Sequence, residues 1–210
     1  MTDAMNAIEE FEKALLMMDR VTAEKIMREA VQQSSLLEAV ETLVVTAFER
    51  IGQGWQEGHI ALAQTYMSAM ICEEVMDSVI SSHPKQKKIQ PKIGIAVLED
   101  HHALGKRIIC SILRASGYEV IDYGHGVSAE ILIEKTVQDK LELLLISTLM
   151  LSSALKVRQV IEGLKEQGAT TKVIAGGAPF RLDTELAKTV GVDTLKNASD
   201  LPALIQGMVK

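Results

Sequence analysis

Short apolar segments alternate with helical patterns along the second half of the chain. The strand-like segments are KIGIAVL, YEVIDYG, LELLLIST, TKVIAGG and VDTLK. Strands that are apolar almost throughout, each followed by a helix, predict a parallel sheet with helices on both of its faces. We therefore expect residues 92–210 to form an α/β domain with a doubly wound, Rossmann-like or flavodoxin-like sheet of five parallel strands.

The first part of the chain has the periodicity of helices instead. In NAIEEFEKALLMM, the residues Ile8, Phe11 and Leu15 recur at helical spacing. Three further helical patterns follow, TAEKIMREAV, SLLEAVETLVVTAFERIGQGW and ALAQTYMSAMICEEVMDSVI. Helices of this length joined by short polar turns predict a four-helix bundle over residues 1–83. The segment SSHPKQKKIQP, with two prolines and three lysines, predicts an exposed linker at residues 84–91.

The composition argues against several classes of function. A formal net charge of −6 does not suit a nucleic-acid surface, which needs an excess of positive charge. No run of roughly 18 apolar residues predicts a membrane-spanning helix, and the acidic, amphipathic N-terminus does not resemble a signal peptide. We expect a cytoplasmic protein that binds neither nucleic acid nor membrane. Cys72 and Cys110 lie in apolar helical patterns without metal-ligand spacing, so we expect two buried thiols.

Polar residues and glycines cluster just after the expected strands, where open parallel sheets bind their ligands. They are Asp100, His102 and Gly105 after the first strand, Ser147, Ser152 and Ser153 after the third, where Leu149 also stands, and Gly176 and Gly177 after the fourth. An imidazole beside a carboxylate is typical of a metal ligand, because the carboxylate holds one ring N–H and raises the basicity of the other nitrogen. One imidazole cannot hold zinc, which takes three or four protein ligands, but it is sufficient for a metal inside a macrocycle. The glycine pair lets the backbone approach such a flat ligand closely.

Taken together, D-x-H-x-x-G, S-x-L and G-G after successive strands resemble a known cofactor-binding fingerprint. The family is the cobalamin-binding module shared by methionine synthase, the corrinoid carriers of anaerobic methyltransferase systems and the carbon-skeleton mutases. The segment GHGVSAE stands where that family has a Gly-x-x-Val-Pro-x-Glu loop. The preceding helices resemble the cap domain of its methyl-transferring members. The resemblance implies a cobalt cofactor, methylcobalamin or another corrinoid.

The resemblance also implies a role for each residue of the pattern. His102 replaces the dimethylbenzimidazole of the cofactor as the lower ligand of cobalt. Asp100 accepts a hydrogen bond from the other ring nitrogen of His102, and Ser153 donates one to Asp100. Ser147 contacts the nucleotide tail of the cofactor, which lies in a groove lined by glycines and Leu149. The expected cofactor contacts are Trp55, Tyr66, Asp100, His101, His102, Ala103, Leu104, Gly105, Ser147, Leu149, Ser153, Gly176 and Gly177.

His101 occupies the variable position of the motif and is expected near the corrin rim or in solvent. No catalytic side chain is expected, because the corrin itself performs the chemistry.

The segment expected above the corrin departs from the methyl carriers. In GQGWQEGHIALAQTY, Ala61 and Ala63 stand where phenylalanine and proline are common in those carriers. Trp55 resembles instead a tryptophan that lies over the upper ligand in cobalamin-dependent photoreceptors. Those photoreceptors also have a Glu-His pair, where this chain has Thr65 and Tyr66, and a helix-turn-helix domain, for which this sequence shows no pattern. Trp55 is therefore expected either over the cobalt or in the bundle core.

Two classes of function remain open. The first, which we favour, is a non-catalytic carrier that moves a methyl group from a substrate-specific methyltransferase to a second one, which acts on an acceptor such as tetrahydrofolate or a thiol. The second is a cobalamin-based sensor or adaptor that signals light, redox state or cofactor level to a partner. A mutase subunit is less favoured because mutases lack the helical cap. Apolar residues left on the bundle suggest that caps pair in a homodimer, while Met67, Met70 and Met76 are expected in the bundle core.

Overall fold

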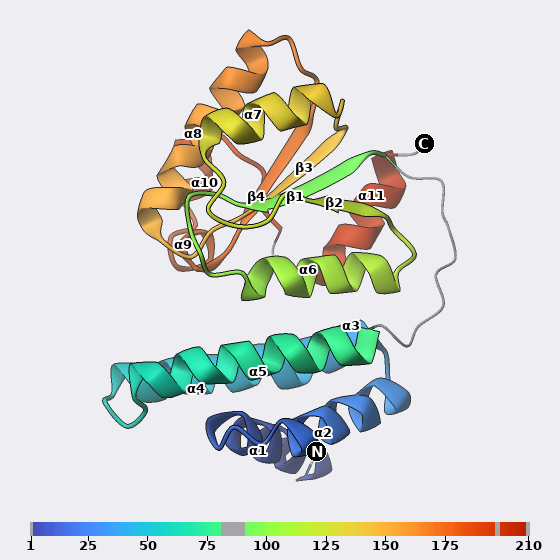
Figure 1. Ribbon diagram of the computed structural model, residues 1–210, viewed down its shortest axis with the longest axis vertical. Coiled ribbons are helices and arrows are strands. Elements are labelled where there is room, and N and C mark those ends of the chain that lie inside the picture. Colours follow the sequence, from blue (N-terminus) through green and yellow to red (C-terminus); the bar gives the residue numbers. More distant parts are fainter. Residues whose placement is uncertain (1, 81–90, 196–197, 209–210) are drawn as a thin grey trace. The chain divides into compact units, whose positions relative to one another are not determined.

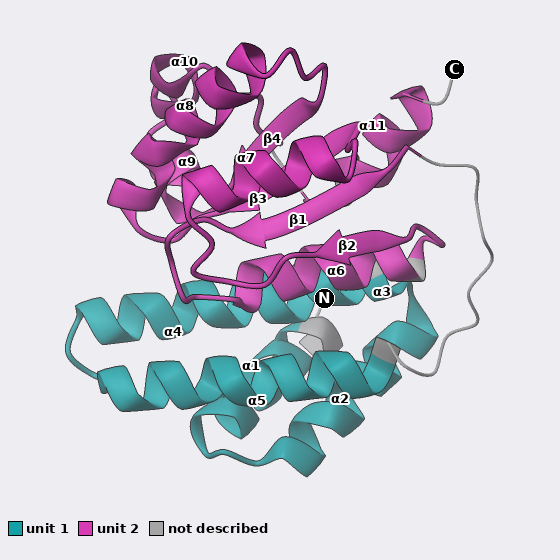
Figure 2. Cartoon of the chain, turned by 45° about the horizontal axis from the view of Figure 1, so that its top comes forward, with its two compact units in different colours: residues 1–84 teal, residues 85–210 magenta. Residues whose placement is uncertain are grey.

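The computed structural model describes residues 2–80, 91–195 and 198–208. The chain divides into two compact units, Met1–Pro84 and Lys85–Lys210 (Figure 2). Apart from Pro91, the linker expected at residues 84–91 lies outside the described residues. None of the described helices combines the length and the apolar content needed to cross a membrane.

Helices make up the described part of the first unit. They are α1 (Thr2–Leu16), α2 (Arg20–Gln33), α3 (Leu36–Ala39), the π-helical segment η1 (Val40–Val45), α4 (Thr46–Gln56) and α5 (Leu62–Ile80). Helix α2 begins at Arg20, earlier than the expected Thr22, because the Asp19 side chain accepts a hydrogen bond from the Thr22 N–H and caps the helix. Helix α1 packs against α2, α4 and α5. Phe11, Leu15 and Met27 are buried between them.

Two expectations about sulfur-containing residues meet different outcomes. Cys72 and Cys110 are buried free thiols, as expected, and burial raises the pKa of Cys72 to about 12. Met76 is buried, but the expectation of core positions for Met67 and Met70 was wrong, because both are partly exposed on α5. Met67 and Met76 are nine residues apart and so lie on opposite sides of the helix. The packing of α5 against α1 and α2 decides which of its faces is covered.

The second unit is built around a parallel sheet, and its strands follow the order β2-β1-β3-β4 (Figure 1). The strands are β1 (Ile93–Val97), β2 (Val120–Asp122), β3 (Leu143–Ser147) and β4 (Lys172–Gly176). The longer helices are α6 (Leu104–Ala115), α7 (Ala129–Gln138), α8 (Leu151–Glu166) and α11 (Leu201–Met208). Leu144 and Ile146 pack with α7 and α8 on one face, while Leu143 and Leu145 pack with α6 and α11 on the other. Both faces are therefore covered, as expected of a doubly wound sheet.

The expectation of a fifth strand at VDTLK was wrong for the described part of the chain, where the sheet has four strands. Asp193 forms only an isolated bridge to Ile174, with its carbonyl accepting from the Ala175 N–H at 3.0 Å. Asp193 and Thr194 are exposed, so this segment lacks the buried residues that would continue the pairing.

The segment RLDTELAKTV does not form one continuous helix. Asp183 has an extended backbone and separates α9 (Ala178–Leu182) from α10 (Leu186–Val190). The short 3-10 helix η2 (Ala198–Asp200) then precedes α11.

Candidate functional site

The loops that follow the strands lie together at the carboxyl edge of the sheet (Figure 1). Backbone hydrogen bonds join the loop after β1 to the loop after β2. The Glu99 N–H donates to the Val127 carbonyl at 2.9 Å, and the Gly126 N–H donates to the Asp100 carbonyl at 2.7 Å. The Thr148 N–H donates to the Gly176 carbonyl at 3.0 Å and joins the loop after β3 to the last residue of β4. The parallel topology thus gathers segments that are far apart in sequence.

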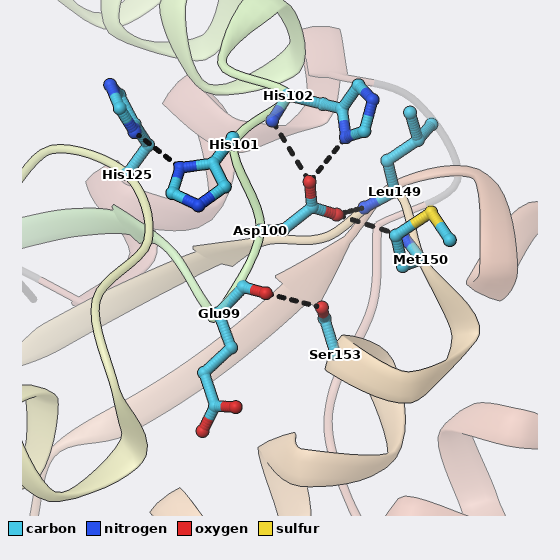
Figure 3. Close-up of polar contacts among 8 residues, drawn as sticks. All are labelled: Glu99, Asp100, His101, His102, His125, Leu149, Met150 and Ser153. Atoms are coloured by element: carbon cyan, nitrogen blue, oxygen red, sulfur yellow. Dashed lines mark hydrogen bonds and ion pairs between the residues drawn. The ribbon is translucent and has the colours of Figure 1, made fainter.

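Asp100 and His102 form the centre of this edge (Figure 3). Asp100 Oδ1 lies 2.5 Å from His102 Nδ1 and accepts the His102 backbone N–H at 3.0 Å. The Asp100 side chain is 1% exposed, whereas that of His102 is 56% exposed. The expected hydrogen bond between the two side chains is therefore confirmed. It engages Nδ1 and leaves Nε2, on the opposite side of an exposed ring, as the nitrogen that can reach a metal.

Two backbone groups complete the surroundings of Asp100. Its Oδ2 accepts the N–H groups of Leu149 at 2.9 Å and Met150 at 3.0 Å. Desolvation raises the pKa of Asp100, but the hydrogen bonds from His102, Leu149 and Met150 together lower it by a larger amount. The pKa of Asp100 therefore lies well below the ordinary value. Asp100 is consequently ionised at neutral pH. An ionised carboxylate accepts the Nδ1–H of His102 and fixes the orientation of the ring, so that Nε2 faces away from Asp100.

The expected hydrogen bond from Ser153 to Asp100 was wrong. Ser153 is buried at the start of α8, and its hydroxyl donates to the Glu99 carbonyl at 3.3 Å (Figure 3). Sequence reasoning missed the backbone donors of Leu149 and Met150, which take that place. Backbone N–H groups are present at every residue other than proline, so no side-chain pattern could indicate them.

The two adjacent histidines have different neighbours. His101 is exposed, and its Nδ1 lies 3.2 Å from Nδ1 of His125, with the ring planes at 75° (Figure 3). His125 was not among the expected site residues, although it stands in the noted segment GHGVSAE. Asp100 thus contacts the ring of His102, whereas His125 contacts the ring of His101, so only the His102 ring is oriented by a carboxylate.

A groove adjoins this centre on the side of the glycines. Its cavity of about 240 Å³ is lined by Gly105, Ser147, Gly176 and Gly177, which sequence reasoning placed together, and by aliphatic side chains. Leu149 was expected in the same groove but is not among the described residues that line it. It is instead an exposed residue beside Asp100.

The glycines of the groove serve different purposes. A Cβ atom on Gly177, whose φ is +126°, would lie 1.7 Å from the Thr148 carbonyl oxygen, so the protein itself requires glycine there. A Cβ atom on Gly176 would meet no protein atom within 4 Å. The open space at Gly176 therefore suits close approach of a ligand. A groove of this kind, beside one oriented imidazole, fits a metal that arrives inside a macrocycle with a long side chain.

The remaining expected contacts are divided between the two units. Ala103 and Leu104 are partly buried where α6 begins. Trp55 and Tyr66 belong to the helical unit, where they are 48% and 63% exposed. Exposure of this size contradicts the alternative that Trp55 is a core residue of the helices. Among the described residues, no three or more His, Cys, Asp or Glu side chains are grouped to hold a metal ion.

Comparisons with known proteins agree with this geometry. The sequence profile of the B12 binding domain matches residues 91–204, and a second profile, also described as a B12 binding domain, matches residues 7–80. The chain is 26% identical over 215 residues to trimethylamine corrinoid protein 2 of Methanosarcina mazei, covering 99% of this chain and 94% of that protein. It is 27% identical over 211 residues to dimethylamine corrinoid protein 1 of the same organism, covering 97% and 96%.

Solved structures share the fold. The monomethylamine corrinoid protein of Methanosarcina barkeri superposes with a TM-score of 0.82 at 22% identity, covering 97% of this chain and 99% of the other. A chain of the methanol:cobalamin methyltransferase complex of the same organism gives a TM-score of 0.52 at 21% identity, covering 97% and 80%.

Proposed function

The chain belongs to the family of B12 binding domains, and we propose that it carries a methyl group on the cobalt of its corrinoid cofactor between two methyltransferases. The homology to methylamine corrinoid proteins covers nearly its whole length. When bound, the corrinoid would supply a cobalt that accepts and gives up the methyl group. The chain supplies binding, orientation and access.

His102 Nε2 is proposed as the lower ligand of cobalt, in place of the cofactor's own base. The observation that carries this proposal is the 2.5 Å contact between Asp100 Oδ1 and His102 Nδ1. A buried, ionised carboxylate fixes both the tautomer and the orientation of an exposed imidazole. The groove lined by Ser147 and Gly176 would hold the nucleotide tail of the cofactor.

The helical unit is proposed as the cap over the upper face of the corrin. Its exposed apolar side chains include Trp55, Leu62, Tyr66 and Met70, the last three at intervals of four residues on α5. Side chains spaced in this way lie along one face of a helix and offer an apolar surface for the corrin. In a carrier, the helical unit must move away so that the upper face of the corrin becomes accessible to the partner proteins. A partner achieves this only by binding the open state better than the closed one.

The partners are proposed to be a substrate-specific methyltransferase and a second methyltransferase that serves an acceptor. Support comes from relatives named as trimethylamine and dimethylamine corrinoid proteins and from the fold shared with a chain of a methanol:cobalamin methyltransferase complex. The second candidate function is a cobalamin-based sensor. Trp55 supports the sensor, because it is exposed and resembles the tryptophan that lies over the upper ligand in cobalamin-dependent photoreceptors.

Paramagnetic resonance of the reduced, Co(II) corrinoid bound to the full chain tests the ligand assignment. An axial nitrogen splits the cobalt signal, and chain labelled with ¹⁵N-histidine changes that splitting only if the nitrogen comes from histidine. We expect the label to change the splitting in the wild type and in His101→Ala. His102→Ala should lose the effect while keeping the fold, because its ring is exposed. Persistence of the label effect in His102→Ala would overturn the assignment.

A transfer assay separates the two functions. As a carrier, the chain loaded with a methylated corrinoid passes the methyl group to a methyltransferase of the methylamine or methanol systems. The sensor would be favoured if no methyl group is transferred and if illumination or a change in redox state alters the oligomeric state of the chain.

A further inference from the structure

The groove beside the glycine pair combines an apolar wall with one positive charge. Aliphatic side chains form most of the wall, among them Ile95, Ile109, Leu145 and Ile174. Of the described residues that line the cavity, Arg181 alone is charged and Ser147 alone carries a hydroxyl group. Arg181 lies in α9, which begins directly after Gly177. The backbone N–H of Arg181 donates to the Gly177 carbonyl at 3.3 Å. One short segment thus presents both the glycine pair and the cation.

The nucleotide tail of cobalamin has a matching composition. It carries an apolar aromatic base, a ribose and one phosphodiester, which keeps a single negative charge at neutral pH. A phosphate that leaves water needs a charged or strongly hydrogen-bonding partner, because an unpaired charge in an apolar site is costly. A guanidinium group matches two phosphate oxygens at once and is less strongly hydrated than an ammonium group.

From this match, we infer that Arg181 binds the phosphodiester of the tail and makes the groove selective for corrinoids that carry a complete tail. The inference rests on the proposed function, in which the corrinoid tail occupies this groove. Arg181 also interacts with another group of the chain. Binding of the phosphate therefore exchanges one partner for another, and the gain is smaller than for an unpaired guanidinium.

Three ligands that differ only in the tail test the inference. Full-length chain free of corrinoid is titrated with hydroxocobalamin, with cobinamide phosphate, which keeps a phosphate but lacks the ribose and base, and with cobinamide, which lacks all three. We expect Arg181→Gln to weaken binding of the first two by about 10- to 100-fold, the range for a hydrogen bond to a charged group. Binding of cobinamide should not change. Arg181→Lys should recover part of the loss, since it keeps the charge but not the forked geometry.

The matched control is Arg158→Gln on α8. Arg158 donates to the Thr189 carbonyl and does not line the cavity, so this change should leave all three affinities as they are. Equal weakening of all three ligands in Arg181→Gln would make Arg181 a structural residue and overturn the inference. Unchanged cobalamin binding would overturn it too, while the proposed function stands. A wild-type chain that binds none of the three would overturn both.

The charge-retaining variant keeps the test decisive if circular dichroism shows that Arg181→Gln is unfolded. In that event, Arg181→Lys should still bind cobalamin and cobinamide phosphate more weakly than the wild type, with cobinamide unaffected. Identical affinities of Arg181→Lys and wild type for all three ligands would then count against the inference.

Discussion

At the scale of single residues, Asp100 shows how a buried carboxylate prepares an exposed histidine. Each of its oxygens accepts two hydrogen bonds, from His102 on one side and from the backbone of Leu149 and Met150 on the other. The carboxylate cannot turn without breaking several of them. Its orientation is therefore set by the backbone of two loops, and the orientation of His102 follows from it.

Asp100→Asn should weaken ligation by His102. The amide keeps the shape but loses the charge, and one of its two groups is a donor that faces N–H groups. We expect the occupancy of the histidine-ligated state, or the cofactor affinity, to fall by about 10- to 100-fold, measured by the splitting of the Co(II) signal. Ser153→Ala should have a smaller effect, since Ser153 bonds to the Glu99 carbonyl and not to Asp100. A larger loss in Ser153→Ala than in Asp100→Asn would contradict this view.

The glycine pair offers a second comparison at this scale. Gly177→Ala places a methyl group against the Thr148 carbonyl and should destabilise the α/β unit by about 3 kcal/mol or more. A loss of this size corresponds to a fall of roughly 6–12 °C in melting temperature. Gly176→Ala meets no protein atom and should leave the melting temperature of the corrinoid-free chain unchanged.

Cobalamin affinity, unlike the melting temperature, should respond to a change at Gly176. Gly176→Ala should reduce cobalamin affinity by about 10- to 100-fold, because the added methyl group occupies space in the groove that the ligand needs. Equilibrium dialysis of the folded variant measures the effect. Wild-type affinity in Gly176→Ala would place the tail elsewhere.

At the scale of elements, an ion pair joins α6 to β2. Lys106 follows Gly105 on α6, and its ammonium group lies 2.5 Å from both carboxylate oxygens of Asp122 at the end of β2. Asp122 also accepts the Gly124 N–H at 2.8 Å and so holds the start of the loop that carries His125. The Lys106 side chain is almost fully buried. This pair therefore connects the helix that begins the cofactor groove with the edge strand of the sheet.

Lys106→Met should destabilise the α/β unit by about 2 kcal/mol, because it leaves the partly buried Asp122 without its cation. Lys188→Met removes an exposed ion pair with Glu185 and should cost less than about 1 kcal/mol. Denaturant unfolding compares the two variants. Equal losses would show that burial adds nothing to the Lys106 pair.

The difference in stability between the wild type and Lys106→Met should depend on pH in one direction. Partial burial raises the pKa of Asp122, but the hydrogen bond from Lys106 and the other contacts lower it to a net value below the ordinary one. The stability contributed by a carboxylate with a lowered pKa is complete above its unfolded pKa of about 4 and is lost as the pH falls through the folded pKa. The gap between wild type and Lys106→Met should therefore shrink as the pH is lowered below about 4. A gap that widens on acidification would contradict the assignment.

At the scale of the whole molecule, the proposed function divides the work between two units. The α/β unit holds the ligand residue and the groove, and the helical unit carries the exposed Trp55 and Tyr66. On the proposed function, Trp55→Ala should speed the loss of the methyl group by light or oxidation, because Trp55 is the largest exposed apolar side chain of the helical unit. Cobalamin affinity should stay near that of the wild type. Absorption spectra followed over time measure the rate.

Val21→Ala on α2 is the matched control, since Val21 is also an exposed apolar residue of the helical unit. It should leave the rate unchanged. Equal rates in the two variants would show that Trp55 does not cover the cofactor.

Sequence reasoning anticipated much of the site because its signals are local. The alternation of apolar strands and helices placed Asp100, Ser147 and Gly176 after successive strands, and a parallel sheet must gather such positions at one edge. It failed where a contact depends on three dimensions. The bond expected from Ser153 to Asp100 goes to Glu99 instead, and the fifth strand is reduced to a bridge at Asp193.

The sequence by itself determined the parallel α/β class, the helical character of the first unit and the choice of residues at the cofactor edge, because periodicity and motif spacing are properties of neighbouring residues. Only the tertiary structure decided which donors surround Asp100, that His101 contacts His125, and that Arg181 lines the groove. These outcomes depend on backbone groups and on loops separated by tens of residues. Such contacts form when the sheet brings its strand ends together, and no local pattern records them.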